Sequence, residues 1–326
     1  MADPWRVLVL GTGAMATAFG GSLARRPGVA VTLAGTWTEA LEALAARGTV
    51  VHDATGRWTA PVAAVPLADA PPADLVLVLA KSHQTASLAE VAARSALPHG
   101  AVVTLQNGLG HRETLEAAVG AGRVAVGVTT SGATVLSPGE VRFFAGRTTL
   151  GEEPPTRRAV TRLAAFLQED GVDAALTSAI DSLVWGKLAI NCSANPLTAL
   201  AGCRNGELLA DPSGRARLCG AAREVGAVAS ALGVRLEDDA AALALRACEA
   251  TAGNRSSMLQ DVLRGARTEI DVLNGAVAAE GRRLGVSAPI VEDLWRRVRA
   301  LEGRPVDGQA PELKATLARH GRERTG

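Results

Sequence analysis

The chain has 326 residues, of which 48% are hydrophobic, and a formal net charge of +1 from 34 basic and 33 acidic side chains. This length exceeds one ordinary hydrophobic core and predicts two domains. The balanced charge, with 3% aromatic residues and no tyrosine, argues against a nucleic-acid-binding face of basic and stacking side chains. We therefore expect a globular protein whose cores consist of Ala, Val and Leu.

Two further patterns concern the compartment of the protein. The N-terminus enters a predicted strand directly, without a basic segment and a separate apolar stretch, and no apolar run has the length of a membrane span. The four cysteines, Cys192, Cys203, Cys219 and Cys248, form no CxxC pair. They predict reduced, mostly buried thiols rather than a zinc site. We expect a cytoplasmic protein with no membrane partner and no metal.

A glycine-rich turn follows the first apolar run. Residues 7–10 predict a buried parallel strand, and an Ala-rich helical segment follows the turn. The turn has the pattern Gly-x-Gly-x-x-Ala and consists of Gly11, Thr12, Gly13, Ala14, Met15 and Ala16. Its glycines permit close approach of the backbone to a ligand, and the helix directs free N–H groups at a pyrophosphate. The sequence predicts a dinucleotide site here, with a purely structural turn as the alternative.

Four further strands are predicted, over 29–33, 74–80, 101–105 and 124–128, and notable polar residues follow the first three. Thr36, near the end of the first, is neither the acid that binds a ribose 2′-hydroxyl nor the Arg that suits a 2′-phosphate. Lys81 and Asn107 follow the second and third strands. Ligands of such sheets bind beyond the strands' carboxyl ends, so we expect these residues at the site. The alternatives are an ordinary strand end at Thr36, a solvated Lys81 and a plain Asn-Gly turn at Asn107.

The remaining elements complete an α/β fold class with two domains. Short extended pieces over 50–65, a hairpin over 139–150, a helix over 156–168 and a piece over 172–176 are assigned to the first domain. Helices are predicted over 180–195, 206–211, 214–232, 237–253, 256–264, 268–284 and 289–302, and a loop with a poorly anchored end over 303–326. We therefore predict a helix-flanked, mostly parallel sheet over 1–178 and an all-helical domain over 179–326.

Three polar side chains share one stripe of the helix predicted over 180–195. Lys187, Asn191 and Asn195 follow one another at intervals of four residues, and their neighbours are largely apolar. Buried polar groups need partners, so the three either satisfy one another or face a polar cleft. Desolvation in a cleft lowers the pKa of a lysine, which would make Lys187 a proton donor near neutral pH.

Two later segments place polar groups at the start of predicted helices. Asn254 and Ser257 belong to a segment that suits a carboxylate ligand at a helix N-terminus, although simple capping accounts for one of its two serines. Thr268 and Asp271 have the spacing of a capping box. That box places Glu269 in the first helical turn, where an ordinary first-turn acid is the alternative.

Together these motifs resemble the ketopantoate reductase (2-dehydropantoate 2-reductase) family over about residues 5–302. The resemblance rests on Gly11-x-Gly13-x-x-Ala16, Lys81, Gln106-Asn107-Gly108, Trp185-x-Lys187-x-x-x-Asn191-x-x-x-Asn195, the segment Asn254-Arg255-Ser256-Ser257-Met258-Leu259-Gln260-Asp261, and Thr268-Glu269-Ile270-Asp271-x-x-Asn274-Gly275. It implies an N-terminal Rossmann domain, a helical C-terminal domain and an active site between them. It also implies NADPH-dependent reduction of ketopantoate to pantoate, on the route to pantothenate and coenzyme A.

The resemblance implies a role for each matching residue. Lys187 would be the general acid, and Glu269 would hold the substrate hydroxyl and orient Lys187. The residues that would bind substrate are Asn191, Asn195, Ser257, Asn254 and Asn107. The residues that would bind the cofactor are the six of the glycine-rich turn together with Thr36, Lys81 and Asn107. Many members carry a basic residue where this chain has Thr36, so we expect NADPH with NADH as the second cofactor.

Several alternatives remain open from the sequence. The substrate is either ketopantoate or a different small 2-oxo acid, since the alkyl pocket is not encoded in the motifs. A non-catalytic dinucleotide-binding regulator is a further alternative, although the polar stripe of residues 187–195 is intact. The apolar helices of the second domain form either a homodimer interface or an internal core.

Overall fold

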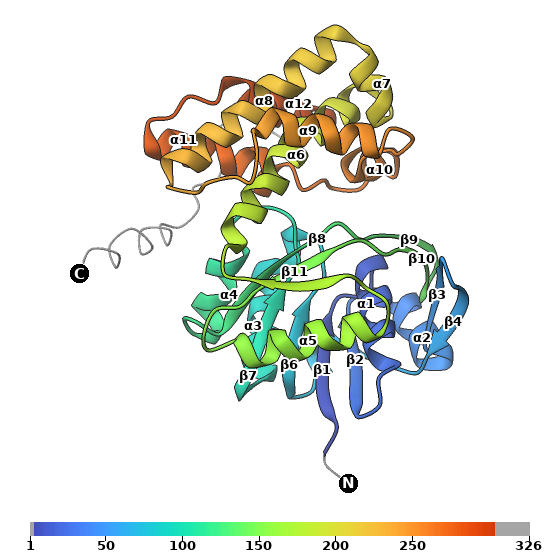
Figure 1. The fold of residues 1–326 in the computed structure, drawn as a ribbon. Helices are drawn as coiled ribbons and strands as arrows, with labels where there is room; N and C mark the ends of the chain where they lie inside the picture. Colours follow the sequence, from blue (N-terminus) through green and yellow to red (C-terminus); the bar gives the residue numbers. More distant parts are fainter. Residues whose placement is uncertain (1–2, 304–326) are drawn as a thin grey trace, which may run out of the picture. The chain divides into compact units, whose positions relative to one another are not determined.

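The computed structural model describes residues 3–303, which form two compact units (Figure 1). The first unit consists of the chain up to Gln106 and of His111–Ile180. The second consists of Asn107–Gly110 and of the chain from Asp181 onwards. Residues 304–326, which include nearly all of the predicted terminal loop, lie outside the described range.

The first unit is built on an eight-stranded sheet with strand order β12-β11-β8-β7-β6-β1-β2-β5. These strands are β1 (Trp5–Leu10), β2 (Val29–Gly35), β5 (Ala63–Pro66), β6 (Ala73–Val78), β7 (Ala96–Thr104), β8 (Val124–Thr129), β11 (Thr148–Gly151) and β12 (Ala174–Thr177). Every neighbouring pair is parallel except β11 with β8. The predicted mostly parallel sheet is confirmed.

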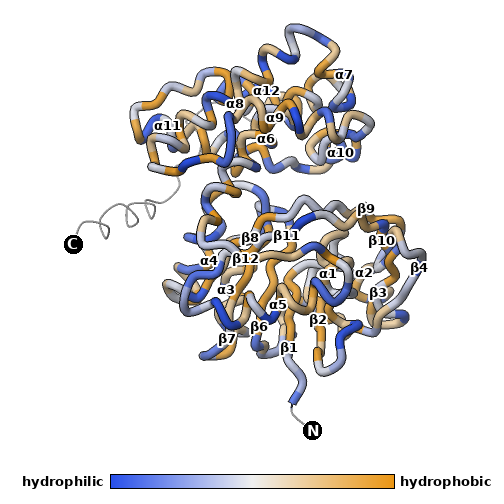
Figure 2. The backbone as a smooth tube through the Cα atoms, in the orientation of Figure 1, coloured by the Kyte–Doolittle hydropathy of each residue, from blue (hydrophilic) through white to orange (hydrophobic). Residues whose placement is uncertain are grey.

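Helices of the first unit bury both faces of this sheet. They are α1 (Ala14–Ala24), α2 (Thr38–Arg47), α3 (Thr85–Ser95), α4 (His111–Val119) and α5 (Arg157–Glu169). Val7 and Val9 of β1 lie in one apolar cluster with Phe19 of α1, whereas Leu8 and Leu10 lie in the other cluster, with residues of α3 and α4. Because successive side chains of a strand alternate between faces, a strand buried on both sides must be apolar throughout. The central strands are accordingly hydrophobic along their length in Figure 2.

A second sheet of four strands makes the predicted hairpin over 139–150 wrong. Its strand order is β4-β3-β10-β9. The strands are β3 (Thr49–Asp53), β4 (Gly56–Ala60), β9 (Gly132–Ser137) and β10 (Glu140–Phe144). The turn lies earlier than predicted, at Pro138–Gly139, where Gly139 has φ of +71° and β9 returns antiparallel as β10. Strand β11 belongs to the other sheet, so residues 145–147 connect two sheets rather than two strands of a hairpin.

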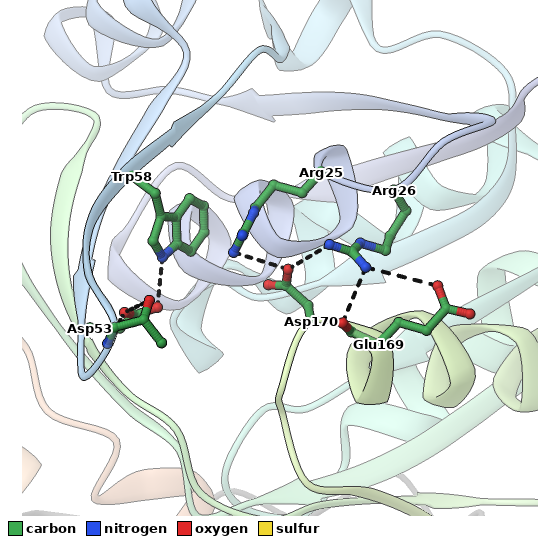
Figure 3. Close-up of polar contacts among 7 residues, drawn as sticks. Arg25, Arg26, Asp53, Trp58, Glu169 and Asp170 are labelled. Atoms are coloured by element: carbon green, nitrogen blue, oxygen red, sulfur yellow. Dashed lines mark hydrogen bonds and ion pairs between the residues drawn. The ribbon is translucent and has the colours of Figure 1, made fainter.

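A polar cluster attaches the β3–β4 hairpin to the ends of α1 and α5 (Figure 3). The guanidinium of Arg25 lies 4.6 Å from the centre of the Trp58 ring, and Trp58 Nε1 donates to the Asp53 carboxylate at 2.6 Å. Arg25 and Arg26 both pair with Asp170, at 3.1 and 3.0 Å. Burial raises the pKa of Asp170, against the effect of the two guanidinium groups. Desolvation is thus the largest influence on this carboxylate.

The second unit is helical, as predicted. Its helices are α6 (Ile180–Ala201), α7 (Asn205–Ala210), α8 (Pro212–Ala231), α9 (Ala240–Ala250), α10 (Ser257–Leu263), α11 (Ala276–Leu284) and α12 (Pro289–Leu301). A π turn, η3 (Asp271–Gly275), precedes α11. In residues 3–303 no strand follows Thr177, and none of the helices combines the length and apolarity of a membrane span. The four cysteines are free, and Cys192 and Cys248 are buried.

Helix α6 continues to Ala201, past the predicted end at residue 195, with Pro196 in its interior. Proline lacks the N–H that would bond to the carbonyl four residues earlier, which is that of Cys192. Asn274 Nδ2 donates to this carbonyl at 2.9 Å. The helix therefore passes through the proline without leaving that carbonyl unsatisfied.

The capping box predicted between Thr268 and Asp271 is wrong. The Asp271 carboxylate accepts from Trp295 Nε1 at 2.9 Å, and Thr268 Oγ1 accepts from the Ile270 N–H at 3.3 Å. The predicted helix over 268–284 begins instead with η3 at Asp271. Glu269 precedes this turn, and its carbonyl accepts from the Leu273 N–H at 3.1 Å.

Candidate functional site

The two glycines of the glycine-rich turn differ in whether the fold itself requires glycine. Gly11 has φ of +132°, and a Cβ there would lie 2.9 Å from the Leu79 carbonyl oxygen, so the fold itself requires glycine. Gly13 has an ordinary φ of −81°, and a Cβ there would meet no atom within 4 Å. Nothing in the described chain requires glycine at position 13. Open space at this position fits a ligand that approaches the backbone.

The start of α1 has the features of an anion site. No side chain caps the helix, and its first turn contains no acidic residue. Thr12 and Ala16 are buried, Ala14 and Met15 are half-buried, and Gly13 is exposed. The free N–H groups and positive end of the helix dipole are therefore accessible at Gly13, which suits a pyrophosphate.

Two further predicted residues lie on loops of the first unit. Thr36 is exposed directly after β2, where the chain offers neither an acid nor an Arg. Lys81 is half-buried, two residues after Leu79, whose N–H bonds to the Leu10 carbonyl at 3.0 Å. The segment that carries Lys81 therefore starts beside the glycine-rich turn.

Gln106 braces the loops that follow β6 and β7. Its Nε2 donates to the Ala80 carbonyl at 2.9 Å and to Thr85 Oγ1 at 3.0 Å. Thr85 Oγ1 also lies 3.1 Å from His111 Nδ1, and both side chains are buried. Sequence reasoning included Gln106 only as part of a motif and missed this bracing role. The available signal was a polar residue at a strand end directly before Asn107.

Residues 107–110 pack with the segment that carries Glu269. Asn107 Nδ2 donates to Glu269 Oε2 at 3.4 Å, and the Leu109 N–H donates to the Val272 carbonyl at 3.0 Å. Gly108 has φ of +102°, and a Cβ there would lie 2.7 Å from Val272. This loop is therefore held by the second unit, and it brings Asn107 to Glu269.

Lys187 lies on α6 with its proton affinity altered by its surroundings. Burial lowers the pKa of Lys187 to about 8, and the charge of Glu269 acts in the opposite direction. A group with this pKa exists in both protonation states close to neutral pH, which suits a general acid. The structure thus brings Lys187, Glu269 and Asn107 into one electrostatic group.

Asn191 and Asn195 continue the stripe along α6. Asn195 is only 9% exposed, and within residues 3–303 neither side-chain amide forms a hydrogen bond. The two amides therefore do not satisfy each other, which was one of the two alternatives for this stripe. Neither amide is among the buried polar atoms that lack a partner, so both reach solvent and are available to a polar ligand.

Ser256, rather than Ser257, caps α10. Ser256 Oγ accepts from the Leu259 N–H at 3.1 Å and from Thr198 Oγ1 at 2.7 Å. Ser257 and Asn254 are exposed, and within the described chain no side-chain hydrogen bond joins them to Lys187 or Glu269. Capping accounts for one of the two serines, as the alternative stated, and the role of Ser257 stays a prediction.

Two family comparisons cover most of the chain. Residues 7–155 match the family described as "Ketopantoate reductase PanE/ApbA". Residues 179–302 match "Ketopantoate reductase PanE/ApbA C terminal".

The residues 3–303 contain no group of His, Cys, Asp and Glu side chains arranged to hold a metal ion.

The chain is also similar to individual proteins over nearly their whole length. A 2-dehydropantoate 2-reductase from Halobacterium salinarum is 38% identical over 299 residues, covering 90% of this chain and 98% of the relative. The crystal structure of a PanE/ApbA family ketopantoate reductase from Ralstonia eutropha is 31% identical, with a TM-score of 0.84. The match covers 91% of this chain and 98% of that one. The ternary structure of a D-mandelate dehydrogenase with NADH and anilino(oxo)acetate is 25% identical, with the same TM-score and coverage.

The open side of Gly13 gives a test of the nucleotide site. Gly13→Ala should lower Tm by no more than about 4 °C, because the added methyl meets no protein atom. It should weaken NADPH binding about tenfold or more, because the methyl occupies the ligand's space. Calorimetric titration and thermal melting measure both effects.

Gly11→Ala is the matched variant. Its methyl meets the Leu79 carbonyl in a backbone conformation that disfavours alanine, so it should lower Tm more than Gly13→Ala does. If Gly13→Ala bound NADPH as the parent does, the ligand does not lie at this turn.

Proposed function

This chain belongs to the ketopantoate reductase family, and from that premise we propose that it reduces the 2-oxo group of ketopantoate to the hydroxyl of pantoate with a nicotinamide dinucleotide. The observation that carries the proposal is Lys187, whose pKa of about 8 reflects burial opposed by Glu269. Asn191 and Asn195 extend the same helix face, and within residues 3–303 their amides form no hydrogen bond.

The proposed chemistry divides between cofactor and protein. A bound nicotinamide supplies the hydride that reaches the carbonyl carbon. Negative charge then develops on the carbonyl oxygen, where the ammonium of Lys187 stabilises it and donates the proton. Glu269 favours the protonated form of Lys187 against the effect of burial and accepts the hydrogen bond of the substrate hydroxyl.

Amide and hydroxyl donors of the second unit hold the substrate in this proposal. Asn191 and Asn195 donate to its polar groups, because their amides reach solvent and form no hydrogen bond within residues 3–303. Asn107 and the two exposed residues Ser257 and Asn254 provide further polar contacts. A neutral donor set beside one lysine suits a small carboxylate with a 2-oxo group.

The nucleotide is assigned to the first unit. The glycine-rich turn of Gly11–Ala16 would hold the pyrophosphate, Thr36 would lie by the adenine ribose, and Lys81 would contact the phosphates. We propose NADPH as the preferred cofactor and NADH as a usable one. Thr36 neither repels a 2′-phosphate nor pairs with it, so the discrimination at this position is weak.

A second candidate is reduction of another 2-oxo acid. It is supported by the similarity to a D-mandelate dehydrogenase whose structure contains NADH and anilino(oxo)acetate. Initial rates with ketopantoate, phenylglyoxylate and pyruvate, each with NADPH and NADH, separate the two candidates. The highest kcat/KM with ketopantoate supports the first proposal, and the highest with phenylglyoxylate supports the second.

Removal of Lys187 tests its role as proton donor. Lys187→Ala should lower kcat by about 10²–10⁴-fold, the range expected for a lost general acid. NADPH affinity should remain within about twofold of the parent, since the assigned nucleotide site is in the other unit. Lys187→Arg is the matched control: it retains the charge but cannot release a proton near neutral pH. It should retain substrate binding better than Lys187→Ala and still lose turnover. A kcat of Lys187→Ala within threefold of the parent, far inside the expected range, would contradict the role.

The direction of the reaction determines the pH dependence. The pKa of Lys187 is about 8, so kcat/KM for reduction should be constant at lower pH and decline above about pH 8 as Lys187 loses its proton. The reverse oxidation needs Lys187 as a base, so its kcat/KM should increase up to about the same pH and then level off. Identical pH profiles in both directions would exclude Lys187 as the titrating group.

Thr36 tests cofactor discrimination. Thr36→Arg should raise the ratio of kcat/KM for NADPH over NADH about tenfold, because the guanidinium can pair with the 2′-phosphate. Thr36→Asp should shift the ratio toward NADH, because a carboxylate repels that phosphate and accepts from a 2′-hydroxyl. Steady-state kinetics with both nucleotides measure the ratio. If neither variant changes it, the ribose is bound elsewhere.

A further inference from the structure

The hydrogen-bond ladder of α6 has a gap between two of the proposed substrate-binding side chains. Pro196 has no N–H, so the Cys192 carbonyl has no helical donor. Asn191 directly precedes Cys192, and Asn195 directly precedes Pro196. Helices bend where a proline interrupts the ladder. A change of bend here would move Asn191, and Lys187 one turn before it, relative to Asn195.

Asn274 closes this gap from a different segment of the second unit. Its Nδ2 donates to the Cys192 carbonyl at 2.9 Å and to the Val291 carbonyl at 3.4 Å. The side chain has 0% exposure, so bulk water does not substitute for the lost donor. One buried amide therefore connects α6 at its proline to the start of α12.

The same residue belongs to the turn that follows Glu269. Asn274 lies in the π turn η3, and the Leu273 N–H of this turn bonds to the Glu269 carbonyl at 3.1 Å. On another side the turn is held by Asp271, which accepts from Trp295 Nε1 at 2.9 Å. π turns are frequent at functional sites because they redirect side chains within a helix. Here the turn directs the Asn274 amide at α6, and the Leu273 N–H of the same turn bonds to the Glu269 carbonyl.

We propose that Asn274 is a positioning residue, which replaces the hydrogen bond removed by Pro196 and thereby holds Lys187 at its place relative to Glu269. The catalytic meaning of this inference rests on the proposed function, whereas the connection itself is a property of the second unit. Without the amide, α6 is free to bend at Pro196 and the two charged groups separate. The carboxylate then supports the ammonium less while burial continues to oppose it, so Lys187 loses its proton at lower pH.

The test is a cycle of Asn274→Ala, Pro196→Ala and the double variant in the full chain. Pro196→Ala restores an N–H to the helix, which can then satisfy the Cys192 carbonyl itself. The pH midpoint of Lys187 is measured by amine labelling at a series of pH values, with mass spectrometry to quantify each site. Lys81, in the other unit, is the internal reference.

Asn274→Ala should lower the Lys187 midpoint by about one pH unit and Tm by about 5 °C. Pro196→Ala should leave the midpoint at the parent value, and the double variant should return to it. Glu269→Gln gives the displacement expected when the carboxylate charge is lost entirely. If Asn274→Ala does not fold, Asn274→Ser, which is polar but shorter, takes its place.

Asn205→Ala is the matched control. Like Asn274, Asn205 is buried, with 9% exposure, and it donates through Nδ2, to Thr251 Oγ1 at 2.8 Å, in a different part of the unit. It should lower Tm without moving the Lys187 midpoint. If Asn274→Ala behaves in the same way, or if the double variant does not recover the midpoint, the proposal is wrong. Ketopantoate turnover by the parent is measured separately, so loss of the proposed function and loss of this inference are distinguishable.

Discussion

Lys187 projects from a helix whose remaining surface is largely buried, and its charge persists there because the carboxylate of Glu269 opposes desolvation. Several hydrogen bonds of the second unit fix the position of Glu269 relative to Lys187. Glu269 comes from a segment more than eighty residues further along the chain, so its position depends on tertiary packing rather than on helix geometry. The bonds of Asp271 to Trp295 and of Asn107 to Glu269 hold that segment from two sides.

The patterns that predicted most of the fold were local. The apolar run before Gly11 and the similar runs ending near Lys81 and Asn107 reflect strands buried on both faces. Their short length, their many valines and the turn residues that follow them distinguish them from helices. The Lys187, Asn191 and Asn195 stripe was readable for the same reason, because four-residue spacing places side chains on one helix face whatever the helix packs against. The candidate site residues of the second unit were also named from motif resemblance, and their roles stay predictions.

The features that were missed depend on partners distant in sequence. Pro196 indicates a helix end by local rules, yet α6 continues to Ala201. The Cys192 carbonyl that the proline leaves without its usual donor accepts from Asn274, 78 residues beyond Pro196. Thr268 and Asp271 have the spacing of a capping box, but the indole of Trp295 takes the carboxylate. The hairpin predicted over 139–150 failed because strand pairing, rather than local alternation, decides which sheet a strand joins. In each case tertiary hydrogen bonding overrode a sound local preference.

Because the loop 107–110 packs with the helical unit, the chain passes between the two units three times, at residues 106–107, 110–111 and 180–181. The units are therefore not two domains joined by a single linker. A helical fragment beginning at residue 181 would lack the Leu109 bond to Val272 and the Asn107 bond to Glu269. Exchange of domains between relatives at the single boundary near residue 180 would join a loop from one parent to a π turn from another. Recombination within this fold is constrained accordingly. Residues 107–110, which interrupt the sequence of the first unit, must be inherited together with the helical segments that they contact.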